Sequence, residues 1–173
     1  KLPMSFPRHT GQLPLYYSQK NTGRPGPGAN DVFWTHYTDS PNTPLYPFGF
    51  GLSYTQFDYS DITLSANTIA VDESLKVSVT LTNSGKRDGV EIAQLYIRDL
   101  IGSITRPVKE LKGFERIALK AGESKQVTFT LGPKTLGFYN TNGEYLVEAG
   151  DFEVFVGGNS DASVTAAFSA TAD

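Results

Sequence analysis

Short alternating runs of apolar and polar residues dominate the chain from residue 61 onward. In the first run, Leu75, Val77, Val79 and Leu81 alternate with polar residues, which is the period of two typical of a half-buried strand. Similar short runs follow at 90–98, 111–119, 127–131, 138–139, 145–147, 152–156 and 164–169. The pattern predicts seven to eight strands and no helix.

Turn residues separate these runs and refine the prediction. Asn142-Gly143, between 138–139 and 145–147, is typical of a β-hairpin. Gly113, inside the run 111–119, predicts a β-bulge. Many short strands in a region of this size predict an all-β domain, an immunoglobulin- or fibronectin type III-like β-sandwich.

Residues 1–60 have a different composition. They contain eight of the ten prolines and 12 of the 21 aromatic residues. The prolines exclude a long helix, whereas a disordered linker would not carry so many rings. We therefore expect a long irregular arm, rich in proline and aromatic residues, that packs on the sandwich or on a neighbouring domain. Within it, Phe48-Gly49-Phe50-Gly51 predicts a backbone that turns tightly against a solid surface.

The composition of the chain argues against several classes of function. The 173 residues carry a formal net charge of −3, which argues against nucleic-acid binding as the main activity. No apolar run approaches the about 20 residues of a membrane span. The chain contains no cysteine, so disulfides and Cys-based zinc sites are excluded for it.

The sequence offers no self-contained active site. Most acidic residues, Glu91 and Glu110 among them, fall in turns or at polar positions of strands, so we expect them to be solvated. His9 and His36 lack a partner at metal-ligand spacing, and Gly51–Thr55 lacks the second glycine of a nucleophile elbow. We therefore predict no catalytic residue, no cofactor-binding residue and no metal ligand.

One aromatic cluster in the arm has two interpretations. Trp34, His36 and Tyr37 lie close to Asp31 and Asp39 in the sequence. Aromatic faces and carboxylates are what a sugar site uses, because rings stack on C–H groups and carboxylates accept hydrogen bonds from hydroxyls. Packing against a neighbouring domain requires the same side chains. Trp34, His36 and Tyr37 are thus candidates for sugar contact or domain contact, with packing favoured.

Longer motifs resemble glycoside hydrolase family 3. The motifs 2–7, 11–17 and 21–25 are similar to the end of that family's second domain, and 46–55 resembles the segment that leads into its C-terminal fibronectin type III-like domain. Motifs 94–99 and 106–114 resemble parts of that last domain. The resemblance implies three regions: 1–17, a remnant of the preceding α/β domain; 18–60, a connecting arm; and 61–173, the sandwich.

The resemblance also implies an activity for a parent enzyme. Its closest likeness is to bacterial periplasmic β-glucosidases, which implies retaining hydrolysis of β-linked glucosides without a cofactor, in the periplasm or outside the cell. In such enzymes the nucleophile is an Asp on a first barrel domain, and the acid/base is usually a Glu on a second domain. The family's Ser-Asp-Trp motif is absent from this chain, so no catalytic residue is carried over.

By itself the chain is expected to be an inactive, structural domain whose partners are the catalytic domains of the same polypeptide. The β-glucoside would be a substrate of the parent only. The alternative is a free-standing module that binds carbohydrate or protein through the aromatic residues of the arm. The sequence leaves open whether two copies form a homodimer.

Overall fold

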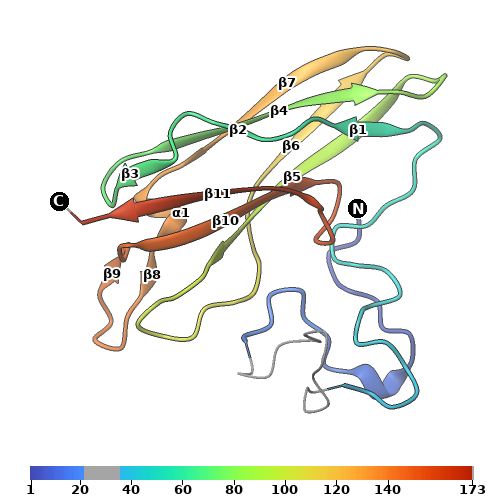
Figure 1. The fold of residues 1–173 in the computed structure, drawn as a ribbon. Coiled ribbons are helices and arrows are strands. Elements are labelled where there is room, and N and C mark those ends of the chain that lie inside the picture. The colour runs from blue at the N-terminus through green and yellow to red at the C-terminus, as the bar shows by residue number, and fades with distance from the viewer. Residues whose placement is uncertain (22–35, 173) are drawn as a thin grey trace.

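Two β-sheets form the body of the protein (Figure 1). The computed structural model describes residues 1–21 and 36–172. In chain order, the elements are η1 (Thr10–Gln12), β1 (Phe57–Tyr59), β2 (Thr63–Leu64), β3 (Thr68–Ala70), β4 (Leu75–Asn83), β5 (Gly89–Asp99), β6 (Glu110–Leu119), β7 (Ser124–Leu131), α1 (Pro133–Leu136), β8 (Phe138–Tyr139), β9 (Tyr145–Leu146), β10 (Gly150–Gly157) and β11 (Val164–Thr171).

The first sheet is built around β4. Strand β7 pairs along one edge of β4, while β1 and β2 pair with successive parts of the other edge, all antiparallel. The second sheet has the order β3-β11-β10-β5-β6, and only its β3–β11 pair is parallel. The chain therefore crosses from one sheet to the other between β2 and β3, and the predicted sandwich is confirmed.

The core lies between the inner faces of the two sheets. Leu75, Val77, Val79 and Leu81 of β4 are all buried, as their alternation predicts. Strand β10 of the second sheet contributes the buried Phe152, which stacks on a phenylalanine of β11 with ring centroids 5.1 Å apart. Alternating positions of both sheets thus supply one continuous core.

The predicted β-bulge and the predicted β-hairpin are both present. Leu95 pairs with Gly113 but Tyr96 pairs with Leu111, so one residue of β6 is extra and forms a bulge. A Cβ at Gly113 would lie 3.0 Å from the ring of Phe129 in the facing sheet. Gly143 has φ +78° in the predicted hairpin between β8 and β9. A side chain would therefore crowd Phe129 at position 113 and strain the backbone at position 143.

Four short elements add to the predicted set. Strands β1, β2 and β3 have two or three residues each, too few for alternation to reveal them. The prediction of no helix misses α1, a single turn of four residues that starts with proline, the residue preferred at a first helical position. These additions extend the two sheets and leave the fold class unchanged.

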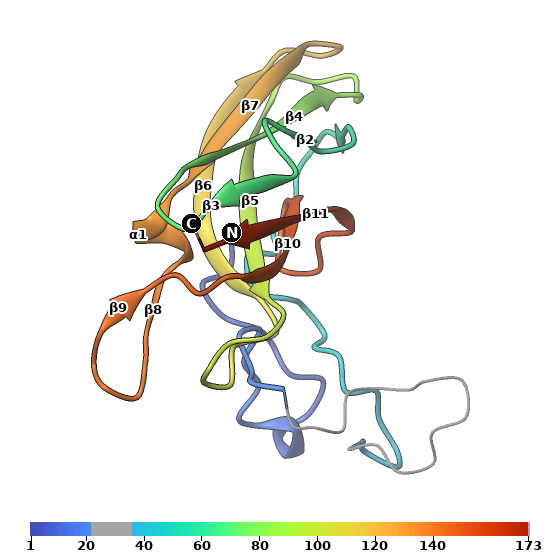
Figure 2. The ribbon, with the colours of Figure 1, turned by 60° about the vertical axis from the view of Figure 1, so that its left-hand side comes forward.

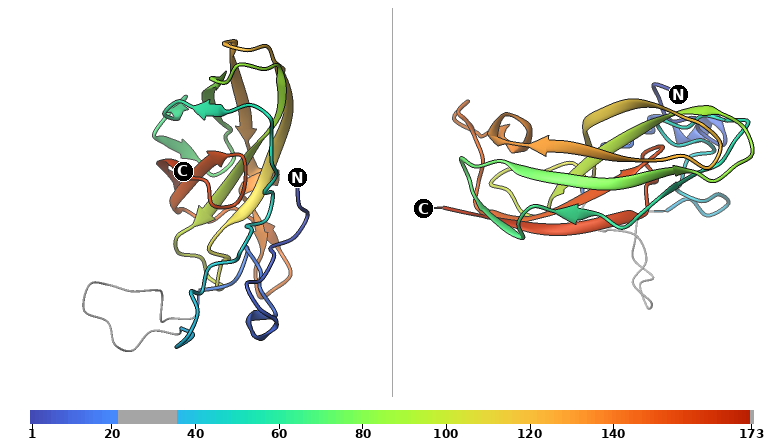
Figure 3. Two further views of the ribbon diagram at one scale, coloured as in Figure 1. Left: turned by 90° about the vertical axis from the view of Figure 1, so that its right-hand side faces the viewer. Right: turned by 90° about the horizontal axis from the view of Figure 1, so that it is seen from above.

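The described parts of the arm lie at one end of the sandwich, as Figures 1, 2 and 3 show from different sides. Residues 1–6 run antiparallel to residues 45–50. Leu2 N–H donates to the Phe50 carbonyl at 2.7 Å, and Phe6 N–H donates to the Tyr46 carbonyl at 2.8 Å. The expected irregular arm is therefore folded back on itself.

Candidate functional site

The arm is fixed to the outer face of the second sheet through the buried side chain of Gln94. Its Nε2 donates to the Gly158 carbonyl at 2.6 Å and to the Gly49 carbonyl at 3.2 Å. Its Oε1 accepts a hydrogen bond from the Tyr96 hydroxyl at 2.5 Å. Both N–H groups and the oxygen of this amide are thus paired, as a buried polar side chain requires.

Gly49 explains the alternation of rings and glycines in the arm. Its φ is +79°, a conformation that side chains rarely adopt, and a Cβ there would collide with the amide of Gln94. The solid surface that the Phe48-Gly49 pattern predicts is therefore the outer face of β5. Gln94 begins the motif 94–99, which resembles part of the family's last domain, but nothing in the sequence indicates that this residue anchors the arm.

Aromatic contacts reinforce this anchor. Tyr17 stacks on Phe48 with ring centroids 4.3 Å apart and meets Tyr96 edge-on at 5.8 Å. Beyond Tyr17, the Gln19 carbonyl accepts a hydrogen bond of 2.9 Å from the N–H of Val108. The arm is consequently attached both to β5 and to the loop between β5 and β6.

A lysine from the same loop supports the junction. The Lys109 ammonium lies 4.0 Å from the ring centroid of Phe155 and donates to the Ser160 carbonyl at 2.8 Å. Burial lowers the pKa of Lys109, and the carboxylates of Asp161 and Glu153 oppose this shift. The lysine therefore acts as a structural cation that stacks on an aromatic face.

Within the arm, the side-chain amide of Gln12 is an anchor like that of Gln94: it is buried and hydrogen-bonds to distant backbone groups. Its side chain is buried; Oε1 accepts the N–H of Arg8 at 2.5 Å and Nε2 donates to the Pro41 carbonyl at 2.8 Å. A single amide thus joins two stretches of the arm that are far apart in the sequence. Nothing in the sequence around Gln12 indicates this role.

The N-terminal residue is held by an ion pair. Lys1 Nζ lies 2.8 Å from Glu91 Oε1, and the Glu91 carboxylate also faces the Tyr59 hydroxyl at 3.4 Å. Burial, and then the nearby Glu91 charge, raises the pKa of Tyr59. The expectation that Glu91 is solvated is wrong, because Glu91 shares the inner face of β5 with the core residue Ala93.

A second buried charge cluster ties down the loop between β5 and β6. The Arg106 guanidinium pairs with Asp99 at 3.4 Å and Glu110 at 2.8 Å, and lies 4.2 Å from the ring centroid of Phe138. Burial raises the pKa of Asp99, while the charge of Arg106 acts in the opposite direction. These groups fix the loop to which the arm attaches.

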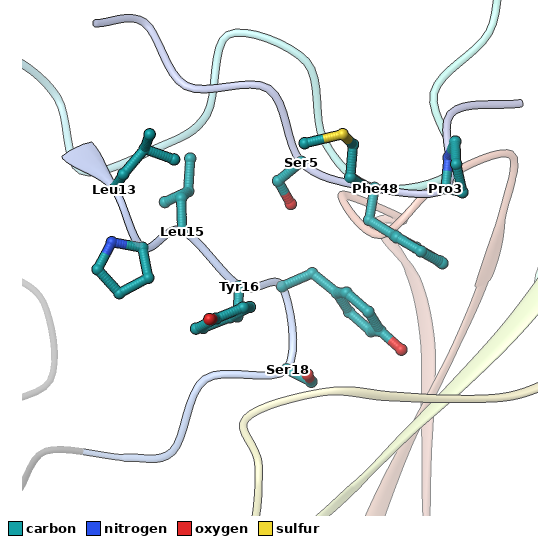
Figure 4. Close-up of a pocket in the computed structure, with 10 residues that line it drawn as sticks. Pro3, Ser5, Leu13, Leu15, Tyr16, Ser18 and Phe48 are labelled. Atoms are coloured by element: carbon teal, nitrogen blue, oxygen red, sulfur yellow. The ribbon is translucent and has the colours of Figure 1, made fainter. Parts of the chain in front are cut away.

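The anchored arm presents an exposed apolar surface. Met4, Leu13, Tyr16 and Leu45, here called the arm surface, are 51%, 56%, 67% and 48% exposed. Three of them line a hollow of about 570 Å³ (Figure 4), whose described lining contains no Asp, Glu or His. Exposed apolar side chains on a fixed framework are typical of an interaction surface.

The candidate aromatic cluster is only partly visible. Trp34 lies outside the described residues. Tyr37 is exposed; its ring meets that of His9 edge-on at 5.9 Å, and its N–H donates to Asn42 Oδ1 at 3.1 Å. His36 is exposed beside it. Neither sugar contact nor domain contact by Trp34, His36 and Tyr37 is tested by this arrangement.

Two further observations concern the described residues alone. Among residues 1–21 and 36–172, no three His, Asp or Glu side chains are placed to hold a metal ion together. In that same part of the chain, no helix has the length and apolar character needed to cross a membrane.

Comparison with known proteins identifies the domain and its context. Residues 91–160 match the family model described as "Fibronectin type III-like domain". The chain is 51% identical to the periplasmic β-glucosidase of Salmonella typhimurium over 158 residues, which are 91% of this chain and 21% of that protein. It is 46% identical to a β-xylosidase of Formosa agariphila, covering 94% of this chain and 22% of that enzyme.

A solved structure shows the same architecture. The β-glucosidase from Listeria innocua in complex with glucose superposes with a TM-score of 0.91 at 43% identity, over 97% of this chain and 24% of that one. The chain therefore spans about a fifth of the length of the relatives it matches. Together with the fold, these matches show that the chain belongs to glycoside hydrolase family 3, as the part that carries the fibronectin type III-like domain.

Proposed function

We propose that this chain is the non-catalytic, structural domain of a β-glucosidase and that its arm surface docks on the catalytic domains of the same polypeptide. The observation that carries the proposal is the arm surface, which is apolar and exposed although buried hydrogen bonds and stacked rings hold the arm in place. A surface prepared in this way is suited to permanent packing.

The relatives support this context. The Salmonella and Formosa proteins are several times longer than this chain and are named for glycosidase activities. We propose that residues 1–17 belong to the preceding α/β domain, that 18–60 connect, and that 61–173 form the sandwich. In this proposal the parent hydrolyses β-linked glucosides in the periplasm or outside the cell, and its catalytic carboxylates lie in the other domains.

The energetic gain from docking comes mainly from the arm surface. Covering one large, half-exposed apolar side chain stabilises the docked state by about 1 kcal/mol. Several such side chains together suffice to hold two domains of one polypeptide in contact, because their connection removes most of the entropic cost of association.

The experiment is a charge substitution in the full-length polypeptide. Tyr16→Asp places a carboxylate in the docking surface, and Tyr139→Asp is the matched control because Tyr139, in the β8–β9 hairpin, is 66% exposed against 67% for Tyr16. We expect Tyr16→Asp to speed thermal inactivation, followed with a chromogenic β-glucoside, while Tyr139→Asp behaves like the unmodified enzyme. Equal effects of the two substitutions would contradict the proposal.

The aromatic cluster supports a finer hypothesis. Trp34, His36 and Tyr37 could contact the sugar or its aglycone if this part of the arm reaches the catalytic domains. In the full-length enzyme, Trp34→Ala should then change the relative rates on β-glucosides with different aglycones. Unchanged selectivity would leave domain packing as the role of these residues.

The alternative functions predict different binding by the isolated chain. A carbohydrate module should bind soluble glucan or xylan oligosaccharides in a calorimetric titration, with a Kd between about 1 μM and 1 mM. A homodimer should show twice the chain mass in sedimentation, and Tyr16→Asp should restore the monomer. A structural domain should bind none of these oligosaccharides.

A further inference from the structure

The tip of the β8–β9 hairpin carries the only asparagine of this sequence that is followed by glycine. Asn142 and Gly143 are both exposed, and a Cβ at Gly143 would meet no atom within 4 Å. Among residues 1–21 and 36–172, no group hydrogen-bonds to the side-chain amide of Asn142. The carbonyl carbon of this amide is therefore accessible to a neighbouring nucleophile.

The nearest backbone nucleophile is the nitrogen of the next residue. Gly143 N–H donates to the Asn140 carbonyl at 3.1 Å, so this hydrogen bond lies within the hairpin tip itself. Strands β8 and β9 have two residues each and form a sheet of their own. Hydrogen bonds at the tip of so short and exposed a hairpin open readily. Glycine also adds no side chain that would hinder the backbone rotation needed for attack.

The two asparagines that are followed by serine are placed differently. In Asn83-Ser84 and Asn159-Ser160, the serine N–H is held by a segment far away in the sequence. It donates to the Gln56 carbonyl at 3.0 Å in the first pair and to the Phe48 carbonyl at 2.8 Å in the second. Each asparagine side-chain oxygen also accepts a backbone N–H from two residues further on, at 3.2 Å and 2.8 Å. Both the amide and its nucleophile are therefore restrained at these two sites.

We propose that Asn142 is a site of spontaneous deamidation. The Gly143 nitrogen loses its proton to a solvent base and forms a bond to Cγ of Asn142. The side-chain nitrogen takes up a proton and leaves as ammonia, which gives a cyclic succinimide. Water then adds to one of the two ring carbonyls and opens the ring, so that residue 142 becomes aspartate or isoaspartate. The net reaction consumes a water molecule and releases ammonia, and no group is oxidised or reduced.

The product changes both the charge and the geometry of the hairpin tip. Either form adds a carboxylate beside Glu144, so the formal net charge goes from −3 to −4. Isoaspartate also routes the main chain through the side-chain carbon, which lengthens the turn. The hydrogen bond of 2.9 Å from Asn142 N–H to Asn140 Oδ1 then no longer fits the turn. The charge change allows the two forms of the chain to be separated.

Incubation of the purified chain at mildly alkaline pH in heavy-oxygen water tests the proposal. Ion-exchange chromatography isolates the more acidic form, and peptide mapping by mass spectrometry locates the isotope in the new carboxylate. We expect the label at residue 142, incorporated at least about tenfold faster than at Asn83 or Asn159. The control is Asn142→Ser, which keeps a residue common in turns and should not form the acidic species at this rate.

The same incubation in guanidinium chloride separates the effect of the structure from that of the sequence. Unfolding frees every amide and every nucleophile, so the rates at Asn83 and Asn159 should rise by a larger factor than the rate at Asn142. Equal factors at the three sites would contradict the argument. Label at residue 142 in the unfolded chain alone would show that the closed hairpin protects the site, and would overturn the proposal. An Asn142→Ser chain that becomes acidic at the unmodified rate would overturn it as well.

Discussion

Replacing Gln94 with leucine should loosen the arm and lower the stability of the whole chain. Leucine has nearly the volume of glutamine, so the change removes the amide and leaves the packing in place. The Gly49 and Gly158 carbonyls then lose their shared donor, and the Tyr96 hydroxyl loses its acceptor. None of these groups gains another partner from the leucine side chain.

The expected cost follows from the burial of these groups. A buried polar group left without its partner costs about 1 to 3 kcal/mol, and a hydroxyl or carbonyl that regains water costs less. With three groups affected, we expect a loss of about 3 kcal/mol in the free energy of unfolding. For a chain of this size each kcal/mol corresponds to about 2 to 4 °C, so Tm should fall by about 6 to 12 °C.

The measurement is thermal and urea unfolding of the chain followed by circular dichroism. The matched control is Gln126→Leu, which makes the same substitution at an exposed position of β7. The control should change the stability by no more than about 0.5 kcal/mol. If Gln94→Leu and Gln126→Leu cost the same, the buried amide does not anchor the arm and the reasoning fails.

The remaining predictions test other contacts of the junction. Gly49→Ala should destabilise the chain by clearly more than Gly122→Ala, since both glycines have positive φ (79° and 76°) but only at Gly49 would a Cβ meet other atoms; urea unfolding of both variants measures the difference. Lys1→Met should cost about 2 kcal/mol because it strands a buried carboxylate, whereas Arg98→Met breaks a surface pair and should cost about 0.5 kcal/mol or less in the same assay. Burial raises the pKa of Asp99 in the folded state above its unfolded value of about 3.9. The stabilisation that Asp99 contributes through this shift is therefore fully present below pH about 3.9 and is lost as the pH rises through the folded pKa. Asp99→Asn should flatten that part of the stability profile, and an unchanged slope would refute the assignment.

The sandwich could be predicted because its signals are local. Strands β4, β5, β6, β7, β10 and β11 have eight or more residues, and their alternation or apolar runs locate them in the sequence. Gly113 indicated the bulge, because glycine in the interior of a strand often marks a bulge. The short strands β1, β2 and β3 could not be predicted, since two or three residues have no period and form strands only because β4 and β11 offer free edges.

The junction could be predicted only in outline. The rings and glycines of the arm indicated a solid surface, but nothing local shows that Gln94 and Gln12 are buried. A glutamine on the outer face of a strand reads as solvent-exposed, and it is buried only when a segment about 45 residues away folds over it. The burial of Glu91 could not be predicted for the same reason, because its partner Lys1 lies 90 residues away in the sequence.

The burial of these three polar side chains has a common physical explanation. Gln94, Gln12 and Glu91 are buried polar groups, and each has at least one partner in a distant part of the chain: Gly49 for Gln94, Pro41 for Gln12 and Lys1 for Glu91. Apolar packing alone would tolerate small displacements of the arm, whereas a buried amide with several fixed partners admits one arrangement. The polar contacts therefore set where the arm lies, and the exposed apolar side chains of Met4, Leu13 and Tyr16 supply what a docking partner covers. Substitutions in the first group should disturb the position of the docking surface, and substitutions in the second group should weaken docking without moving it.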